Sequence, residues 1–385
     1  MMNPYSPQYP ADPEHFADRK EIIEYFKSNV INFAKTPKAK PVNFAVLGEW
    51  GIGKTSVIYK FQQIIIEELS RQIKSFNSLF TLTPQICDNL DNFFQTFINQ
   101  LKEEYTAAAG IEDRLKSEIE KWIPTIKTPI ADFTRKNVTA YFARDLENLW
   151  KKHLQAAKLD AAFLFLDDIH HFLPKQPGAY ETLRNIFQSL AMKGCKYSLT
   201  ITGPKILFTY IADTAEPFVR FFHPFYLDSF NLDDTREAIM RPLKLAGLDL
   251  DLQQEVIGEV YARTGGHPYF IIYTMRELLN NLGGKKRVKI DDFKEIWPKI
   301  ISSLEETKFS PDFEVASVEE RKILQKIAEV RQDTVTPSMI KTKDRKILSR
   351  LENKGLLVKV DRGKYRIYHP LFKEYVKRQS NRQNL

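Results

Sequence analysis

The sequence of 385 residues predicts an α/β fold in which a parallel sheet flanked by helices is followed by an all-helical segment and a small module of helices and a hairpin. Three observations carry this prediction. An apolar strand at residues 42–47 leads into a glycine-rich loop and an amphipathic helix. A second apolar strand, at residues 161–166, ends in two aspartates. The third observation is the run of helices that occupies residues 233–304.

The chain is long for one domain, so we divide it into residues 1–230, 231–310 and 311–385. In the first part, Asp18 is expected to cap a helix that ends near Phe33. Further strands are expected at residues 75–82, 197–203 and 225–227, and further helices at 56–66, 91–105, 145–159 and 181–192. The second part is expected to contain helices at residues 233–245, 252–264, 269–282 and 290–304. Residues 106–139 receive no functional assignment.

The glycine-rich loop matches G-x-x-x-x-G-K-[ST], the phosphate-binding pattern called Walker A. Glycines allow backbone N–H groups to surround a phosphate, and a helix N-terminus adds partial positive charge. Lys54 is expected to reach the β- and γ-phosphates, and the Thr55 hydroxyl to bind Mg²⁺. The sequence therefore predicts a nucleotide site. The predicted loop residues are Gly48, Glu49, Trp50, Gly51, Ile52, Gly53, Lys54, Thr55 and Ser56.

The strand that ends in Asp167 and Asp168 predicts the second half of the site. A strand buried on both faces delivers its last side chains to the C-terminal edge of a parallel sheet. Asp167 is expected to hold Mg²⁺, and Asp168 to orient or deprotonate the attacking water.

Weaker candidates lie beyond these aspartates. Thr202 and Lys205 are candidates for sensing phosphate at the end of the next strand. Arg220 is either a charge stabiliser or a surface arginine. His170 and His171 have no ligand-spaced partner, which favours a structural role over metal binding.

Composition narrows the class of protein. The content of 43% hydrophobic and 28% charged residues is typical of a soluble globular protein. No apolar run approaches the ~18 residues that a membrane span needs, and the two cysteines suggest no disulfide framework, so we expect a cytoplasmic protein. The net charge of +8 is concentrated at one end. Residues 317–385 hold 18 basic and 8 acidic residues, whereas the remaining 39 basic and 41 acidic residues nearly balance.

The C-terminal module has the layout of a winged helix. Helices are expected at residues 318–330, 337–340 and 343–354, followed by a hairpin over 355–360 and 364–368 and a short helix from Leu371. A basic recognition helix and wing would contact duplex DNA through the groove and the phosphate backbone. Alternatively, these charges form a solvated surface and the module binds protein. The candidate DNA contacts are Lys343, Arg345, Lys346, Arg350, Arg362 and Lys364.

Taken together, these motifs resemble those of the archaeal and bacterial STAND-type ATPases, which are related to AAA-type ATPases. The resemblance includes the opening residues 3–7, the Phe16 to Arg19 box and the Gly-Gly-His-Pro-Tyr stretch at residues 265–269. It implies a P-loop NTPase core, a helical lid and a winged-helix domain that bind ATP and Mg²⁺. It further implies that Pro268 lies near the adenine and that Phe16 and Arg19 close over the base or ribose.

Some features depart from that group. The stretch from Gly48 to Gly51 is similar to the P-loop of the KAP group of NTPases, although the membrane segments of many KAP members are absent. Lys205 stands near the position where many relatives have an arginine, and Asp168 replaces a common glutamate, which predicts slow turnover. We therefore expect an ATP-binding and hydrolysing switch. The alternatives are a DNA-binding regulator or initiator-like loader in which ATP only sets conformation, and a signalling scaffold that binds protein or itself. The lid lacks the Gly-x-x-Arg arrangement of the archaeal initiators.

Overall fold

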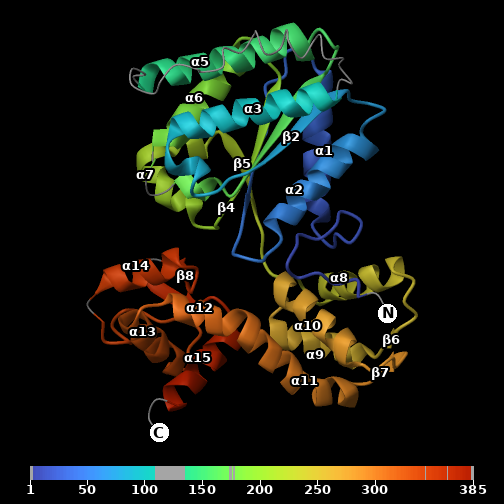
Figure 1. The fold of residues 1–385 in the computed structure, drawn as a ribbon, viewed down its shortest axis with the longest axis vertical. Helices are drawn as coiled ribbons and strands as arrows, with labels where there is room; N and C mark the ends of the chain where they lie inside the picture. The colour runs from blue at the N-terminus through green and yellow to red at the C-terminus, as the bar shows by residue number, and fades with distance from the viewer. Residues whose placement is uncertain are drawn as a thin grey trace.

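The structure, a computed structural model, describes residues 3–108, 135–172, 176, 178–342, 344–361 and 363–382. A five-stranded parallel sheet forms the centre of the first part (Figure 1). The spatial order of its strands is β2 (Ser75–Thr81), β3 (Ala161–Asp167), β4 (Tyr197–Gly203), β1 (Asn43–Leu47) and β5 (Phe222–Tyr226). The predicted parallel sheet is therefore confirmed, and β4 lies between the two strands that carry the predicted site motifs.

Helices cover both faces of this sheet (Figure 1). Alternate residues of the strands supply the two cores because successive side chains point to opposite faces. Phe44, Phe163 and Phe165 pack on one side with α1 and α2, whereas Ala45 and Leu164 pack on the other. The α-helices of this part are α1 (Lys20–Lys35), α2 (Lys54–Gln63), α3 (Leu90–Ala108), α5 (Arg135–Asn148), α6 (Gly178–Met192) and α7 (Leu207–Val219). They are accompanied by short π-helices η1 (Ile64–Glu68) and η3 (Leu149–Leu154) and short 3₁₀ helices η2 (Ile86–Asp88) and η4 (Ile169–Phe172).

The start of α1 differs from the prediction. Arg19, not Asp18, occupies the N-cap position, and no side chain caps the helix. Both residues adopt left-handed backbone conformations, with φ of 62° at Asp18 and 66° at Arg19. The Asp18 carboxylate pairs with the Arg19 guanidinium at 3.4 Å instead of with the helix. The predicted cap at Asp18 is therefore wrong.

Four helices follow the sheet where the sequence predicts them, and we call residues 231–310 the lid. Its helices are α8 (Leu232–Leu245), α9 (Gln254–Thr264), α10 (Pro268–Asn281) and α11 (Ile290–Leu304), and two short parallel strands, β6 (Asp251–Leu252) and β7 (Arg287–Val288), join their ends. The lid lies beside the C-terminal edge of the sheet (Figure 1). None of the helices in the described residues is long and apolar enough to cross a membrane.

The C-terminal unit combines helices with a hairpin. Its elements are η5 (Glu305–Phe309), α12 (Ser310–Val315), α13 (Val318–Glu329), α14 (Arg345–Asn353), β8 (Leu357–Asp361), β9 (Lys364–Ile367) and α15 (Pro370–Arg382). The helix predicted at residues 337–340 is a turn instead. Val335 pairs with Tyr365 beside the hairpin, so the chain is still extended immediately before this turn and little length remains for a helix.

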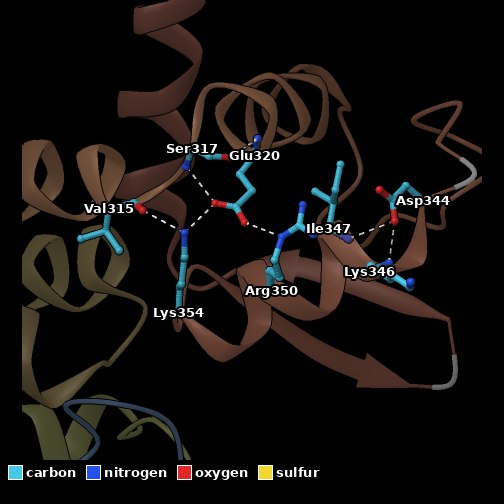
Figure 2. Close-up of polar contacts among 8 residues, drawn as sticks. All are labelled: Val315, Ser317, Glu320, Asp344, Lys346, Ile347, Arg350 and Lys354. Carbon is cyan, nitrogen blue, oxygen red and sulfur yellow. Dashed lines mark hydrogen bonds and ion pairs between the residues drawn. The ribbon is translucent and has the colours of Figure 1, made fainter.

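A buried carboxylate joins α13 to α14. Glu320 is 2% exposed, and its oxygens accept hydrogen bonds from Ser317 N at 2.8 Å, Arg350 Nε at 2.9 Å and Lys354 Nζ at 2.6 Å (Figure 2). Burial alone would raise the pKa of Glu320, but hydrogen bonds from Lys354, the Ser317 N–H and Arg350 lower it to about 2. Arg350 therefore contributes to the structure of this unit. The Asp344 carboxylate caps α14 by accepting from Lys346 N and Ile347 N (Figure 2).

Candidate nucleotide-binding site

The phosphate loop connects β1 to α2 through two glycines in the left-handed region. Gly51 has φ of 70° and Gly53 has φ of 95°, conformations that favour glycine. A Cβ atom added to Gly53 would meet nothing within 4 Å, so open space lies where the loop turns into α2. Gly53 is also the N-cap of α2 and offers no side chain to its first N–H groups. These N–H groups therefore remain available to an anion.

Lys54 and Thr55 begin α2 inside this loop. The Lys54 ammonium donates a hydrogen bond to the Glu49 carbonyl oxygen at 3.0 Å. The Thr55 hydroxyl donates to Asp167 Oδ2 at 2.7 Å, which brings the two predicted metal ligands together from the start of α2 and the end of β3. The two residues meet because the C-terminal ends of the parallel strands β1 and β3 lie at the same edge of the sheet.

Thr202 links the two aspartates that follow β3. Its hydroxyl donates to Asp167 Oδ1 and accepts from Asp168 N, the latter at 2.8 Å. Asp168 has φ of 61°, which turns its side chain away from the strand direction. Asp168 then lines the cavity described below, and His170 Nδ1 lies 3.6 Å from its carboxylate. The register of β3 and β4 thus places Thr202 where its one hydroxyl fixes both acids.

Burial dominates the electrostatics of the loop. It lowers the pKa of Lys54, although Asp168, Asp167 and Glu49 favour the charged ammonium. Burial likewise raises the pKa of Asp167, against the hydrogen bonds that it accepts from Thr202 and Thr55. Both pKa shifts belong to charged groups that are shielded from water. In such a place an added counter-charge gains the most electrostatic interaction energy.

The oxygen atoms at this edge suit a magnesium ion together with phosphate. A hydroxyl and a carboxylate oxygen are hard ligands, and Mg²⁺ in nucleotide sites takes its other ligands from phosphate and water. Across the described ranges, no group of three or more His, Cys, Asp or Glu side chains forms a metal site from protein ligands alone. The hydroxyl and carboxylate oxygens of Thr55 and Asp167 fit a cation that takes its remaining ligands from phosphate and water.

A cavity of about 350 Å³ extends from the phosphate loop to the lid. On one side, the cavity is lined by residues of the sheet-containing part of the chain, which we call the core. These include Gly51, Gly53, Lys54, Thr55 and Asp168. The volume of the cavity lies within the range of small-molecule sites. The apolar and aromatic lining residues come from the N-terminal segment, from the lid and from Phe230 just before it: Tyr5, Tyr9, Phe16, Phe230, Pro242, Pro268, Tyr269 and Ile272.

Residues 3–17 cross this cavity, and we call them the strap. The Tyr5 hydroxyl is buried and donates to the Ile239 carbonyl oxygen of α8 at 2.6 Å. Farther along, Ala11 N donates to Ser56 Oγ of α2 at 3.0 Å. The strap is therefore tied to the lid at one point and to the phosphate loop helix at another.

Two residues predicted to lie over the base or ribose, Phe16 and Arg19, stand at the end of the strap and just after it. Phe16 is 7% exposed and lines the cavity, and its carbonyl oxygen accepts a hydrogen bond from Arg241 of α8. Arg19 also lines the cavity, donates to the Asp228 carbonyl oxygen at 2.6 Å and lies 5.2 Å from the centre of the Phe230 ring.

The remaining predicted residues divide into two groups. Trp50, Ile52, Ser56 and Pro268 line the cavity, whereas Gly48 and Glu49 lie outside its lining. Gly48 N donates to the Gly203 carbonyl oxygen at 3.1 Å, which ties the loop to β4.

Two weaker candidates do not line this cavity. Lys205 pairs with Asp228 at 2.6 Å, and Arg220, whose side chain is 79% exposed, pairs with Glu216. The structure therefore shows no contact of either side chain with the cavity.

Sequence reasoning missed Tyr5, Tyr9, Phe230 and Tyr269 as parts of the site. Tyr5, Tyr9 and Phe230 lie outside helices and strands, and Tyr269 is the second residue of α10, so their local sequence carries no sign of a ligand. The one available signal was the abundance of Tyr and Pro in residues 4–10.

Comparisons with solved structures agree with this architecture. The Walker-type ATPase PABY2304 of Pyrococcus abyssi shares 16% identity, with a TM-score of 0.59 over 96% of this chain and 99% of that one. The Aeropyrum pernix ORC2 protein in ADPNP–ADP complexes shares 13% identity, with a TM-score of 0.62 over 99% and 98%. At these identities, the likeness establishes the fold. No curated protein sequence matches the chain.

The model of the KAP family P-loop domain matches residues 23–240, which include the phosphate loop, both aspartates and the whole sheet. This match covers more than half of the chain and agrees with the similarity of residues 48–51 to the KAP loop. The chain belongs to the KAP family of P-loop NTPases.

Proposed function

We propose that the protein is an ATP-binding and ATP-hydrolysing switch that holds Mg·ATP between the sheet and the lid. The observation that carries this proposal is the single cavity lined by Lys54, Thr55 and Asp168 on one side and by Pro268 and Tyr269 on the other. A ligand that contacts both sides favours their closed arrangement, because it binds that arrangement more tightly.

The residues divide the chemistry between them. Lys54 and the loop N–H groups bind and neutralise phosphate oxygens, and Thr55 with Asp167 would hold Mg²⁺, which supplies charge stabilisation to the transferred phosphoryl group. Asp168 orients water for in-line attack on the γ-phosphorus. Its shorter side chain, compared with glutamate, reaches less far, so turnover is expected to be slow.

Substitution of Lys54 tests the site. In Lys54→Ala, loss of the buried ammonium should weaken ATP binding at least tenfold in isothermal titration, because a charge-assisted phosphate contact is removed. Lys60→Ala is the matched control, since it removes one ammonium from the same helix at a residue outside the cavity lining. Asp168→Asn should retain ATP binding but lose phosphate release. Unchanged ATP affinity in Lys54→Ala would refute the site.

We propose further that the C-terminal unit is a winged helix of the STAND type that contacts duplex DNA. Support comes from the basic excess of residues 317–385 and from the order of α13, the turn at 337–341, α14 and the hairpin β8–β9. Arg345 and Lys346 are exposed at the start of α14, and Lys364 is exposed on the hairpin. The predicted contacts Lys343 and Arg362 lie outside the described residues.

Charge reversal distinguishes contact of DNA with α14 from attraction of DNA by the overall positive charge. Arg345→Glu with Lys346→Glu should weaken binding of a labelled duplex in fluorescence anisotropy, and wild-type affinity should fall steeply with salt because phosphate contacts release counterions. Reversal of Lys294 and Lys299 on α11 is the matched control for net charge. Duplex affinity that is unaffected by both salt and the α14 reversal would favour the protein-binding alternative.

A further inference from the structure

Helix α10 belongs to two hydrophobic clusters. Phe270 and Tyr273 pack with the C-terminal unit, whereas Ile271, Met275 and Leu278 pack within the lid. A second connection joins the two parts at α9, where the His369 ring donates through Nε2 to the Thr264 carbonyl oxygen at 2.9 Å. Because α10 contributes to the hydrophobic clusters of both parts, the lid and the C-terminal unit are expected to move together. We call residues 231–382 the arm.

The arm contacts the backbone of the phosphate loop at the start of α10. His267 donates through Nε2 to the Trp50 carbonyl oxygen at 3.1 Å, and Tyr269 N donates to the Gly51 carbonyl oxygen at 3.3 Å. The contact is close, since a Cβ atom on Gly51 would lie 2.9 Å from the Tyr269 Cβ. The position of the arm therefore bears directly on the shape of the loop.

The hairpin of the C-terminal unit contacts the side chains of the same loop. Arg366 of β9 pairs with the Glu49 carboxylate at 2.6 Å, and the two side chains are 33% and 23% exposed. Beside this pair, the Lys308 ammonium lies 3.9 Å from the centre of the Trp50 ring. Glu49 is thus held from two directions, because its carbonyl oxygen also accepts from Lys54, the residue expected to bind phosphate.

A second contact joins the arm to the core at α14. Glu352 of α14 lies near Tyr210 of α7: burial is the main cause that raises the pKa of the Tyr210 hydroxyl, and the Glu352 carboxylate is the next. The C-terminal half of α14 therefore faces the core, while Arg345 and Lys346 at its other end are exposed. Together with the Arg366 pair, this places two elements of the C-terminal unit beside the core.

We propose that Arg366 is a positioning residue of the nucleotide site, and that nucleotide binding and docking of the arm stabilise one another through Glu49. The proposal rests on the function proposed above. The coupling between nucleotide binding and docking is expected to be positive. Both the core and the arm line the cavity, so a nucleotide there favours the docked arrangement. By linkage, the docked arm favours nucleotide binding by the same factor by which nucleotide favours docking, so loss of a docking contact weakens nucleotide binding.

Nucleotide affinity of Arg366→Gln tests the proposal. For a partly exposed ion pair, the dissociation constant for ADP and for a non-hydrolysable ATP analogue should rise about two- to fivefold. Arg378→Gln is the matched control, because it removes an arginine–carboxylate pair with Glu305 inside the arm. Glu49→Gln combined with Arg366→Gln should bind nucleotide no more weakly than the weaker single variant, since both remove one interaction.

Hydrogen exchange supplies a readout that a merely structural role would not move. Nucleotide should slow exchange in α7 and α14 of the wild-type protein, and this protection should decrease in Arg366→Gln but not in Arg378→Gln. Additive losses of affinity, or nucleotide protection that is equal in all variants, would overturn the proposal. A wild-type protein that binds no nucleotide would instead refute the function on which it rests.

Discussion

Glu320→Gln hardly changes the shape of the side chain, yet it should strongly destabilise the C-terminal unit. The carboxylate is buried and accepts hydrogen bonds from Ser317, Arg350 and Lys354. Its pKa falls from an ordinary 4.5 to about 2 in the folded protein. At about 1.4 kcal/mol per pKa unit, this difference corresponds to about 3 kcal/mol of stability at neutral pH. Glutamine keeps one acceptor oxygen but loses the charge that the two cations require.

The effect has a defined pH dependence. Because folding lowers the pKa of Glu320, its contribution is fully present above the unfolded value near 4.5 and is lost as pH falls toward 2. The difference between wild type and Glu320→Gln should therefore be constant from about pH 8 to pH 5.5 and should shrink in more acidic solution.

Hydrogen exchange of α13 and α14, compared between variants at each pH, measures the difference without requiring the whole chain to unfold in one step. Glu319→Gln is the matched control, since it neutralises the exposed neighbouring carboxylate. Equal exchange in the two variants at pH 7 would refute the reasoning. A difference that persists unchanged at pH 3 would refute its electrostatic basis.

Three further predictions concern the nucleotide site. Gly51→Ala should weaken nucleotide binding at least tenfold in isothermal titration, because its Cβ would strike the lid; Gly194→Ala, with φ of 82° and no neighbour near its Cβ, controls for backbone strain. Thr202→Val should lower steady-state phosphate release at least tenfold by freeing Asp167, and unchanged turnover would contradict this role. Tyr5→Phe should accelerate release of a fluorescent nucleotide about fivefold in stopped flow, since about 1 kcal/mol of strap anchoring is lost; an unaltered release rate would show that the strap does not limit exit.

Local patterns predicted the sheet and the phosphate loop well. The strand at residues 161–166 is apolar throughout because both of its faces are covered. Its burial could therefore be inferred without knowing which strands lie beside it. The Walker A spacing was equally informative, since glycine positions and Lys54 are fixed by phosphate geometry along a continuous stretch. Asp167 met Thr55 as expected, because parallel strands place their C-terminal ends together.

Contacts between distant segments were not predictable in this way. Glu49 and Arg366 are 317 positions apart, and Tyr5 reaches a carbonyl oxygen 234 positions away. Each side chain is ordinary in its local sequence. The sequence analysis also did not predict α7, which contains Pro217 and a non-helical residue at Ala215. Single-sequence patterns describe periodicity and turn chemistry, whereas these features depend on which surfaces meet after folding.

The strap has a consequence for the speed of nucleotide exchange. If the base binds beneath residues 3–17, as the proposed function expects, its dissociation rate should depend on how often the bonds of Tyr5 to α8 and of Ala11 to Ser56 open together. The equilibrium affinity for phosphate is expected to depend instead on Lys54, at the other end of the cavity. Residence time and affinity are therefore adjustable by different residues. A bulky fusion placed immediately before residue 3 would shorten the dwell of the nucleotide while leaving the phosphate loop intact.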